Sequence, residues 1–174
     1  MSNVKLVKGS CVEQNVDAIV NAANKYLAAG GGICGAIFEK AGYEELGHAC
    51  SVIETPLKDG DAVITPAFGI TNAKYIIHAV GPNFAVTPGA FDNLYDAYYN
   101  SLNVLKENNL HSISFPFISS GIFGGDLENP VEVSVTEFLR AYGDFVKENR
   151  DYDIDVSICA FSEKEMDNAK PKFR

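Results

Sequence analysis

The chain has 174 residues, of which 47% are hydrophobic, and it carries a formal net charge of −9. This length and composition fit one globular domain over residues 1–174 and exclude a disordered protein. No apolar run could cross a bilayer, and the first residues lack the apolar segment of a signal peptide. No stretch is rich in Lys or Arg, which disfavours nucleic acid as a partner. We therefore expect a cytoplasmic monomer that contacts no membrane.

Strands and helices are predicted to alternate along the chain. Short runs rich in β-branched residues predict strands over residues 3–7, 17–21, 61–65, 74–80, 112–118 and 154–161. Helices are predicted over residues 32–41, 43–53, 91–107 and 130–149, and Ser162 caps a short last helix. The inner face of the 91–107 helix is predicted to hold Leu94, Ala97, Tyr98, Ser101, Leu102 and Leu105. This order predicts an α/β fold, a three-layer α/β/α sandwich with a mixed, largely parallel central sheet.

The first glycine loop, residues 24–32, follows the second predicted strand and enters a helix. Asn21 and Asn24 present uncharged polar side chains there, and Gly30 to Gly32 allow close approach of the backbone. Free N–H groups at a helix start favour a phosphate. Gly30, Gly32 and Gly35 also match a dinucleotide-binding pattern, but nine residues separate Val20 from Gly30, which disfavours a Rossmann unit. A plain flexible loop is the structural alternative.

The second glycine loop, residues 119–125, follows the fifth predicted strand. In a largely parallel sheet, ligands bind beyond the carboxyl ends of the strands, where both glycine loops fall. The two loops could therefore hold a diphosphate from opposite sides. Ser119 and Ser120 are disfavoured as nucleophiles because no nucleophile elbow surrounds them.

Four scattered cysteines, Cys11, Cys34, Cys50 and Cys159, form no C-x-x-C pair, so we expect reduced, buried thiols and no metal site. Cys34 stands at a predicted helix start, where a thiol can become nucleophilic, and His78 could serve as its base. A small packing residue beside a ligand is the favoured interpretation of Cys34.

Three sequence blocks resemble the macro domain family. The first is Val20-Asn-Ala-Ala-Asn24 followed by Gly30-Gly-Gly-Ile-x-Gly-Ala-Ile37, the second is Ile76-Ile-His-x-Val-Gly-Pro82, and the third is Phe115-Pro-x-Ile-Ser-x-Gly-Ile-Phe-Gly124. They fall in family order, and the resemblance extends from about residue 4 to residue 161. The chain is most similar to the MacroD-like branch.

The resemblance implies a pocket for ADP-ribose that needs no cofactor. Asn24 would orient the distal ribose and Phe123 would pack against it, which makes both candidate catalytic residues. The first phosphate loop would use Gly31, Gly32, Ile33 and Cys34, with Asn21 close by; the second would use Ser119, Ser120, Gly121, Ile122 and Phe123; and Ser10, Cys11 and Phe161 would lie at the adenine.

The implied activity is hydrolysis of mono-ADP-ribose from acidic side chains, or of O-acyl-ADP-ribose. Two departures bear on it. Ser10 replaces an aspartate that would bind the adenine amino group, and Cys34 replaces an aspartate that helps to position water. These departures support the alternative function, a reader module that binds ADP-ribose or an ADP-ribosylated protein without chemistry.

Overall fold

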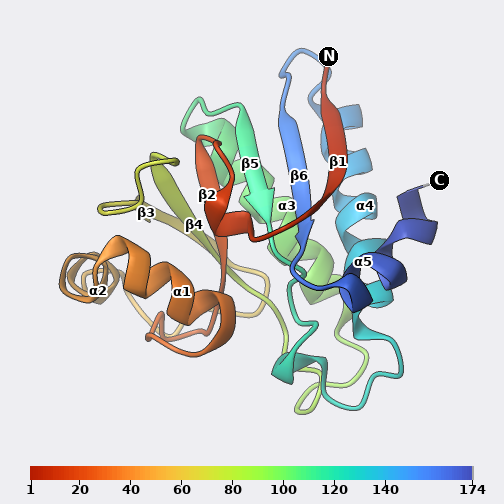
Figure 1. The fold of residues 1–174 in the computed structure, drawn as a ribbon, viewed down its shortest axis with the longest axis horizontal. Helices are drawn as coiled ribbons and strands as arrows, with labels where there is room; N and C mark the ends of the chain where they lie inside the picture. Colours follow the sequence, from red (N-terminus) through yellow and green to blue (C-terminus); the bar gives the residue numbers. More distant parts are fainter. Residues whose placement is uncertain (174) are drawn as a thin grey trace.

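The computed structural model describes residues 1–173. Its strands are β1 (Asn3–Lys8), β2 (Ala18–Ala23), β3 (Ala62–Pro66), β4 (Tyr75–Val80), β5 (Ser112–Phe115) and β6 (Asp155–Ala160) (Figure 1). The α-helices are α1 (Gly32–Ala41), α2 (Tyr43–Ser51), α3 (Phe91–Glu107), α4 (Pro130–Glu148) and α5 (Glu163–Ala169). Three 3₁₀ turns complete these elements: η1 (Cys11–Glu13), η2 (Ile122–Gly124) and η3 (Lys170–Phe173). Within residues 1–173, no helix is both long and apolar enough to cross a membrane.

The strands form one sheet in the order β1-β6-β5-β2-β4-β3. All neighbouring strands pair in parallel except β3, which runs antiparallel to β4 at the edge. This arrangement confirms the predicted mixed, largely parallel sheet. The carboxyl ends of the five parallel strands therefore meet at one edge of the sheet, which lies at the bottom of Figure 1.

The sheet changes its direction of winding between β5 and β2. From β2 the chain passes through α1 and α2 to β3 on one side, and from β5 it passes through α4 to β6 on the other. β2 and β5 share only two register pairs, whereas β2 and β4 share six. The carboxyl ends of β2 and β5 consequently separate, and such a switch point is where open α/β sheets bind ligands.

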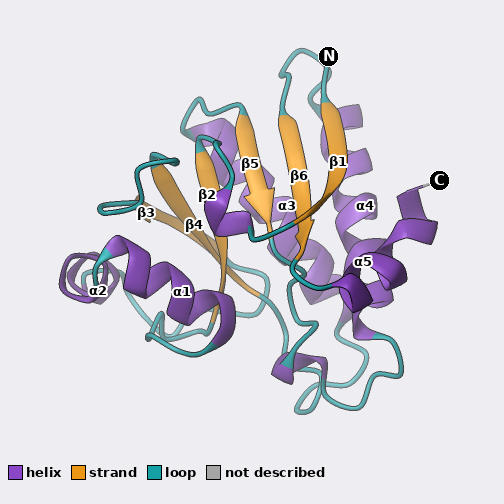
Figure 2. Ribbon diagram, viewed as in Figure 1, coloured by secondary structure: helices purple, strands orange, loops and turns teal. Residues whose placement is uncertain are grey.

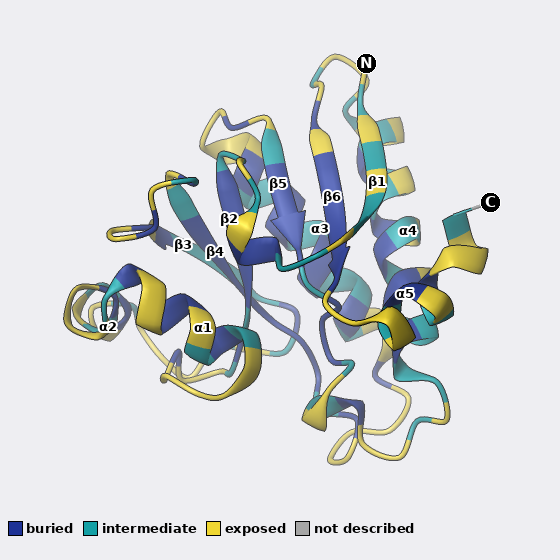
Figure 3. Cartoon of the chain, in the orientation of Figure 1, coloured by how far each residue is buried: buried dark blue, intermediate teal, exposed yellow. Residues whose placement is uncertain are grey.

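Helices cover both faces of the sheet (Figure 2). α1 and α2 pack on one face, where Ile19 and Ile76 contribute to an apolar cluster with them. α3, α4 and α5 pack on the other, where Val20 and Ile77 belong to a second cluster. The alternation along β2 and β4 divides these side chains between the faces because successive strand residues point in opposite directions. The three-layer α/β/α sandwich is therefore confirmed, with strands buried at the centre (Figure 3).

Helical periodicity correctly predicted the inner face of α3, since all six predicted residues are buried. Three boundaries differ from prediction by two residues or more, and several others differ by one residue. β5 ends at Phe115 instead of residue 118, because Pro116 has no N–H to continue the ladder. α2 ends at Ser51 instead of residue 53, where Val52 is the C-cap. β2 continues to Ala23, so Asn21 lies within the strand instead of at its end.

Candidate active site

Asn24 shapes the first glycine loop with its own side chain. Its Oδ1 accepts hydrogen bonds from the backbone N–H groups of Tyr26 (3.0 Å) and Ala28 (3.1 Å). Its Nδ2 donates to the carbonyl oxygen of Ala28 at 2.9 Å. One amide hydrogen remains to bind a ligand, because a side-chain amide nitrogen carries two. Asn24 thus folds the loop and still has a donor to offer.

Asn21 lies beneath this loop and is 1% exposed. Its Nδ2 lies 3.0 Å from Nδ1 of His78 and 3.8 Å from Sγ of Cys34. Because an amide nitrogen only donates, Nδ1 of His78 accepts, and Nε2–H of His78 donates to Oγ1 of Thr65 at 2.9 Å. Oδ1 of Asn21 has no partner within the described residues, which leaves a buried acceptor suited to a bound water.

The structure separates Cys34 from His78, because Asn21 lies between them. Burial lowers the pKa of His78 to about 4, so its imidazole is neutral at pH 7, and both ring nitrogens already have partners. Burial raises the pKa of the Cys34 thiol. Its Sγ donates to the carbonyl oxygen of Ala28 at 3.6 Å. This neutral thiol links α1 to the first glycine loop, and the two residues form no nucleophile–base pair.

No side chain of the helix itself satisfies the free N–H groups or balances the positive dipole end at the N-terminus of α1. Gly31 caps it without a side-chain hydrogen bond, and no acidic residue lies in its first turn. The other four α-helices of residues 1–173 each have an acidic residue in the first turn. The N–H groups of Gly32, Ile33 and Cys34 lack helical acceptors by position. Together with the helix dipole, they favour a bound anion here.

The second glycine loop is fixed by its hydroxyl groups. The Ser119 hydroxyl donates to the carbonyl oxygen of Pro82 at 2.7 Å, and the Ser120 hydroxyl donates to that of Phe117 at 2.7 Å. Neither serine is therefore a free nucleophile. Within residues 1–173, the backbone N–H groups of residues 119–123 donate to no protein acceptor. The loop thus offers backbone donors to a ligand.

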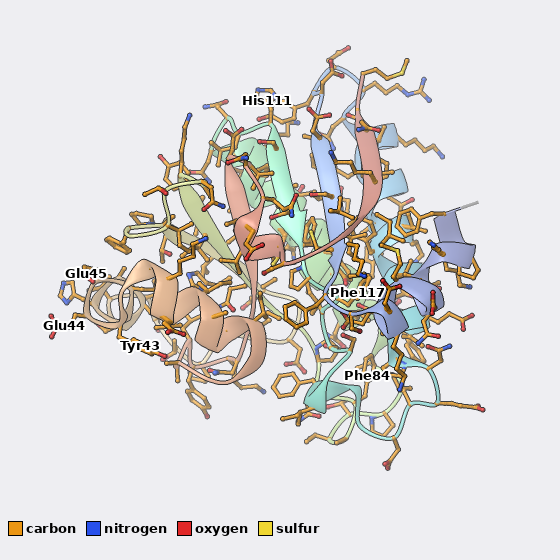
Figure 4. The ribbon with its side chains drawn as sticks, viewed as in Figure 1. Tyr43, Glu44, Glu45, Phe84, His111 and Phe117 are labelled. Atoms are coloured by element: carbon orange, nitrogen blue, oxygen red, sulfur yellow. The ribbon has the colours of Figure 1, made fainter. Side chains whose placement is uncertain are left out.

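Contacts with the segment after β4 hold the second glycine loop beside the end of β2. The backbone N–H of Phe84 donates to the carbonyl oxygen of Phe123 at 2.8 Å. β4 itself pairs with β2 as far as Val80 opposite Ala23. Figure 4 shows Phe84 and Phe117 at this end of the molecule. Both glycine loops thus flank the end of the β2–β4 pair.

The residues predicted to contact adenine, Ser10, Cys11 and Phe161, follow the ends of β1 and β6. These two strands pair along the whole of β1, from Asn3 to Lys8. Oγ of Ser10 accepts from the N–H of Val12 at 3.2 Å and so caps η1. The carbonyl oxygen of Cys11 accepts from the Ser114 hydroxyl at 2.8 Å, which places η1 over β5. Phe161 is 77% exposed, which excludes a core role and leaves its ring free to stack.

Sequence patterns indicated no site role for three residues that support the site, Thr65, Tyr98 and Ser134. His78 and Thr65 join Asn21 through the register of β2, β4 and β3, and Tyr98 and Ser134 support the second glycine loop from below. No group of three or more His, Cys, Asp or Glu residues able to hold a metal occurs in the described residues.

The parallel sheet order and the two glycine loops at its switch point define an open α/β domain with helices on both faces. Residues 20–134 match the model of the Macro domain family, and the chain belongs to that family.

Relatives share most of this chain. It is 41% identical over 172 residues to a macro domain-containing protein of Caldanaerobacter subterraneus subsp. tengcongensis, covering 92% of this chain and 96% of that one. It is 37% identical over 164 residues to mouse ADP-ribose glycohydrolase MACROD1, covering 93% of this chain and 49% of the mouse protein. The chain spans 28% of a Thermotoga maritima relative that is 38% identical. The structure of the Oceanobacillus iheyensis macrodomain with ADP superimposes with a TM-score of 0.88 at 33% identity, covering 99% of this chain and 90% of that one.

Proposed function

We propose that this chain binds ADP-ribose between the two glycine loops and hydrolyses the ester that joins the distal ribose to an acidic side chain or an acyl group. The observation that carries this proposal is the set of backbone N–H groups without protein acceptors, which belong to two loops at one sheet edge. The related glycohydrolase and the macrodomain solved with ADP support it.

Backbone N–H groups can donate hydrogen bonds to the anionic diphosphate without the help of charged side chains, which are scarce in the two glycine loops. The first glycine loop contains one charged residue, Lys25, and the second contains none, although the whole chain is acidic. The diphosphate would lie between the α1 N-terminus and the N–H groups of residues 119–123. Adenine would stack on Phe161 and lie near Ser10 and Cys11, and Phe123 would pack on the distal ribose.

The proposed chemistry is positional and electrostatic. Water adds across the ester, which releases ADP-ribose and the free acid. Neither Cys34 nor His78 serves as a base, because the thiol has a raised pKa and the imidazole is buried and fully hydrogen-bonded. The free amide hydrogen of Asn24 orients a ribose hydroxyl, and the water is activated next to the ligand's own phosphate. Orientation of this kind can account for large rate gains.

A non-catalytic reader is the second candidate function. It is favoured by Cys34, a neutral thiol at the start of the helix where the resemblance implies a carboxylate. Such a module would bind the modified protein and leave its ester intact. Both functions predict binding of ADP-ribose, so only turnover separates them.

We also infer that the protein works in the cytoplasm without binding nucleic acid. All four cysteines are free and buried, which suits a reducing compartment. The net charge of −9 disfavours a polyanionic partner.

The proposal is tested by release of ADP-ribose from a protein mono-ADP-ribosylated on glutamate. Asn24→Ala removes the ribose donor and also the loop contacts, whereas Asn24→Asp keeps acceptors for the N–H groups of Tyr26 and Ala28. We expect both variants to release ADP-ribose at least about ten-fold more slowly, which is roughly 1.4 kcal/mol of barrier.

Thermal unfolding separates a local effect from a loss of fold, and calorimetry measures ADP-ribose affinity. Wild-type release with Asn24→Asp near the wild-type rate would limit Asn24 to shaping the loop. Binding without release would identify the reader. Absence of ADP-ribose binding would refute both functions.

A further inference from the structure

Three buried polar side chains on adjacent strands have no role as an acid or a base in the proposed hydrolysis. They are Thr65 of β3, His78 of β4 and Asn21 of β2, which are 4%, 0% and 1% exposed. β4 lies between β2 and β3 in the sheet. Burial of a polar side chain costs free energy unless hydrogen bonds compensate it, so the partners of these residues indicate what they do.

The Thr65 hydroxyl selects the tautomer of His78. Nε2 of His78 lies 2.9 Å from Oγ1 of Thr65, and Nδ1 lies 3.0 Å from Nδ2 of Asn21. In a neutral imidazole one ring nitrogen donates and the other accepts. Nδ1 faces an amide nitrogen, which only donates, so Nδ1 accepts and the ring proton is on Nε2. Thr65 accepts that proton and thereby stabilises the tautomer that the Asn21 amide requires.

This tautomer holds the amide of Asn21 in one orientation. Nδ2 carries two hydrogens, and its second partner is Sγ of Cys34 at 3.8 Å. Oδ1 has no partner within residues 1–173. Rotating the amide by half a turn would give Oδ1 a partner in His78 only if the ring proton moved to Nδ1, because otherwise Oδ1 would face a lone pair. The imidazole therefore keeps Asn21 donating to the thiol.

The thiol of Cys34 connects this arrangement to the first glycine loop. Because Sγ accepts from Asn21, its S–H is free to donate to the carbonyl oxygen of Ala28 at 3.6 Å. The same carbonyl oxygen accepts from Nδ2 of Asn24 at 2.9 Å. This bond uses one amide hydrogen of Asn24 and leaves the other for the distal ribose. The position of the Ala28 carbonyl therefore sets the direction in which Asn24 offers its free hydrogen.

We propose that His78, held in one tautomer by Thr65, is a positioning residue for Asn24. It acts through the amide of Asn21, the thiol of Cys34 and the loop carbonyl to which both the thiol and Asn24 donate. This inference rests on the proposed function, because it concerns the contact between Asn24 and the distal ribose. Burial lowers the pKa of His78 to about 4, so the neutral ring keeps this pattern of hydrogen bonds at pH 7.

Thr65→Val tests the first step of this chain of contacts. Valine keeps the branched shape of threonine in β3 but gives Nε2–H of His78 no acceptor. A buried N–H without an acceptor is costly, so the ring proton should move to Nδ1 and the Asn21 amide should turn to accept it. The thiol would then donate to Oδ1 of Asn21 and no longer to Ala28.

Two further variants are the controls. Thr65→Ser keeps a hydroxyl that can accept from Nε2–H of His78. Ser101→Ala removes a hydroxyl that is also buried but lies in α3, where it donates to the carbonyl oxygen of Ala97 at 2.7 Å. Thermal unfolding shows which variants keep the fold.

The first measurement is the tautomer of His78, which the chemical shifts of its ring nitrogens report at pH 8. The signals of His78 are those that disappear in His78→Gln. We expect the proton on Nε2 in wild type, Thr65→Ser and Ser101→Ala, and on Nδ1 in Thr65→Val. Loss of packing alone would not move this proton.

The second measurement is the affinity for ADP-ribose relative to that for ADP, determined by calorimetry. Both ligands contain the adenosine and the diphosphate, but only ADP-ribose has the distal ribose. We expect Thr65→Val to lower this ratio about three-fold, a modest factor because hydrogen bonds to sulfur are weak. Thr65→Ser and Ser101→Ala should keep the wild-type ratio. Because no bond is cleaved, the measurement applies equally to a hydrolase and to a reader.

The two proposals fail in different ways. An unchanged ratio in Thr65→Val, an equal loss in Thr65→Ser or Ser101→Ala, or a wild-type proton on Nδ1 would overturn the inference and leave ADP-ribose binding intact. Failure of wild type to bind ADP-ribose would instead refute the proposed function.

Cys34→Ala provides a second variant should Thr65→Val unfold. It removes the thiol between Asn21 and Ala28 and leaves the contact between Thr65 and His78 in place. The ratio should fall in Cys34→Ala, whereas Cys34→Ser, which keeps a donor and an acceptor, should retain more of it. An unchanged ratio in Cys34→Ala would overturn the inference.

Discussion

The phenolic oxygen of Tyr98 lies 2.6 Å from Oγ of Ser134, and together these residues close a ring of hydrogen bonds beneath the second glycine loop. The N–H of Ile118 donates to the Tyr98 oxygen at 3.0 Å, and the Ser134 hydroxyl donates to the carbonyl oxygen of Ile118 at 2.6 Å. The Tyr98 hydroxyl must therefore donate to Ser134. This ring satisfies both backbone groups of the residue that precedes the loop.

Removing the Tyr98 hydroxyl should weaken both the fold and the site. Tyr98→Phe leaves the buried N–H of Ile118 without an acceptor, which should lower the free energy of unfolding by about 1–3 kcal/mol. We also expect weaker ADP-ribose binding, because the second glycine loop loses its support. Urea unfolding and calorimetry measure the two effects.

Tyr95→Phe is the matched control on the same helix. Its hydroxyl contacts Asp144 at a partly buried position and no backbone of the loop. It should lower the free energy of unfolding by about 1 kcal/mol or less, because water can replace the lost hydrogen bond at a partly buried position, and it should leave ADP-ribose binding unchanged. Equal effects from both variants would contradict a special role for the ring.

Burial of neutral His78 should make stability depend on pH. Its pKa is lowered to about 4 in the folded protein, from an ordinary value of 6.5. Between these values the unfolded chain binds the proton and the folded one does not, so the free energy of unfolding falls as pH falls from 6.5 toward 4. The total loss is on the order of 3 kcal/mol. Above pH 6.5 this contribution does not change.

Urea unfolding at pH 7, 5.5 and 4.5 measures this dependence. His78→Gln cannot titrate, so its stability should fall less steeply over this range than that of wild type. Parallel curves for the two proteins would show that His78 is not the source of the dependence.

The four cysteines should be unreactive in the native protein. All are buried, and burial raises the pKa of each thiol, which keeps the thiolate population low at pH 8. With a chromogenic disulfide reagent, we expect no fast thiol in the folded protein and four in denaturant. One thiol per chain reacting within seconds, and lost in Cys34→Ser, would instead indicate an activated cysteine.

Local patterns in the sequence were sufficient to predict the helices and strands and the kinds of residue found at the candidate site. The inner face of α3 follows from helical periodicity, because apolar residues three and four apart lie on one side of a helix. The two glycine loops were located because glycines follow strands and precede helical turns. The prediction for Asn24 as a ligand remains untested, but the structure adds that most of its hydrogen-bonding capacity is used within the loop.

Only the tertiary structure decided which strands meet and what supports the loops. Asn21 faces His78 because β2 and β4 pair in parallel at that register, and no spacing along the chain encodes this pairing. The short pairing of β2 with β5 and the ring of hydrogen bonds between Tyr98, Ser134 and Ile118 likewise depend on contacts between segments distant in sequence. Sequence determined the segments through local backbone preference and apolar periodicity, whereas packing determined their neighbours, because contacts between remote residues depend on the whole folded chain.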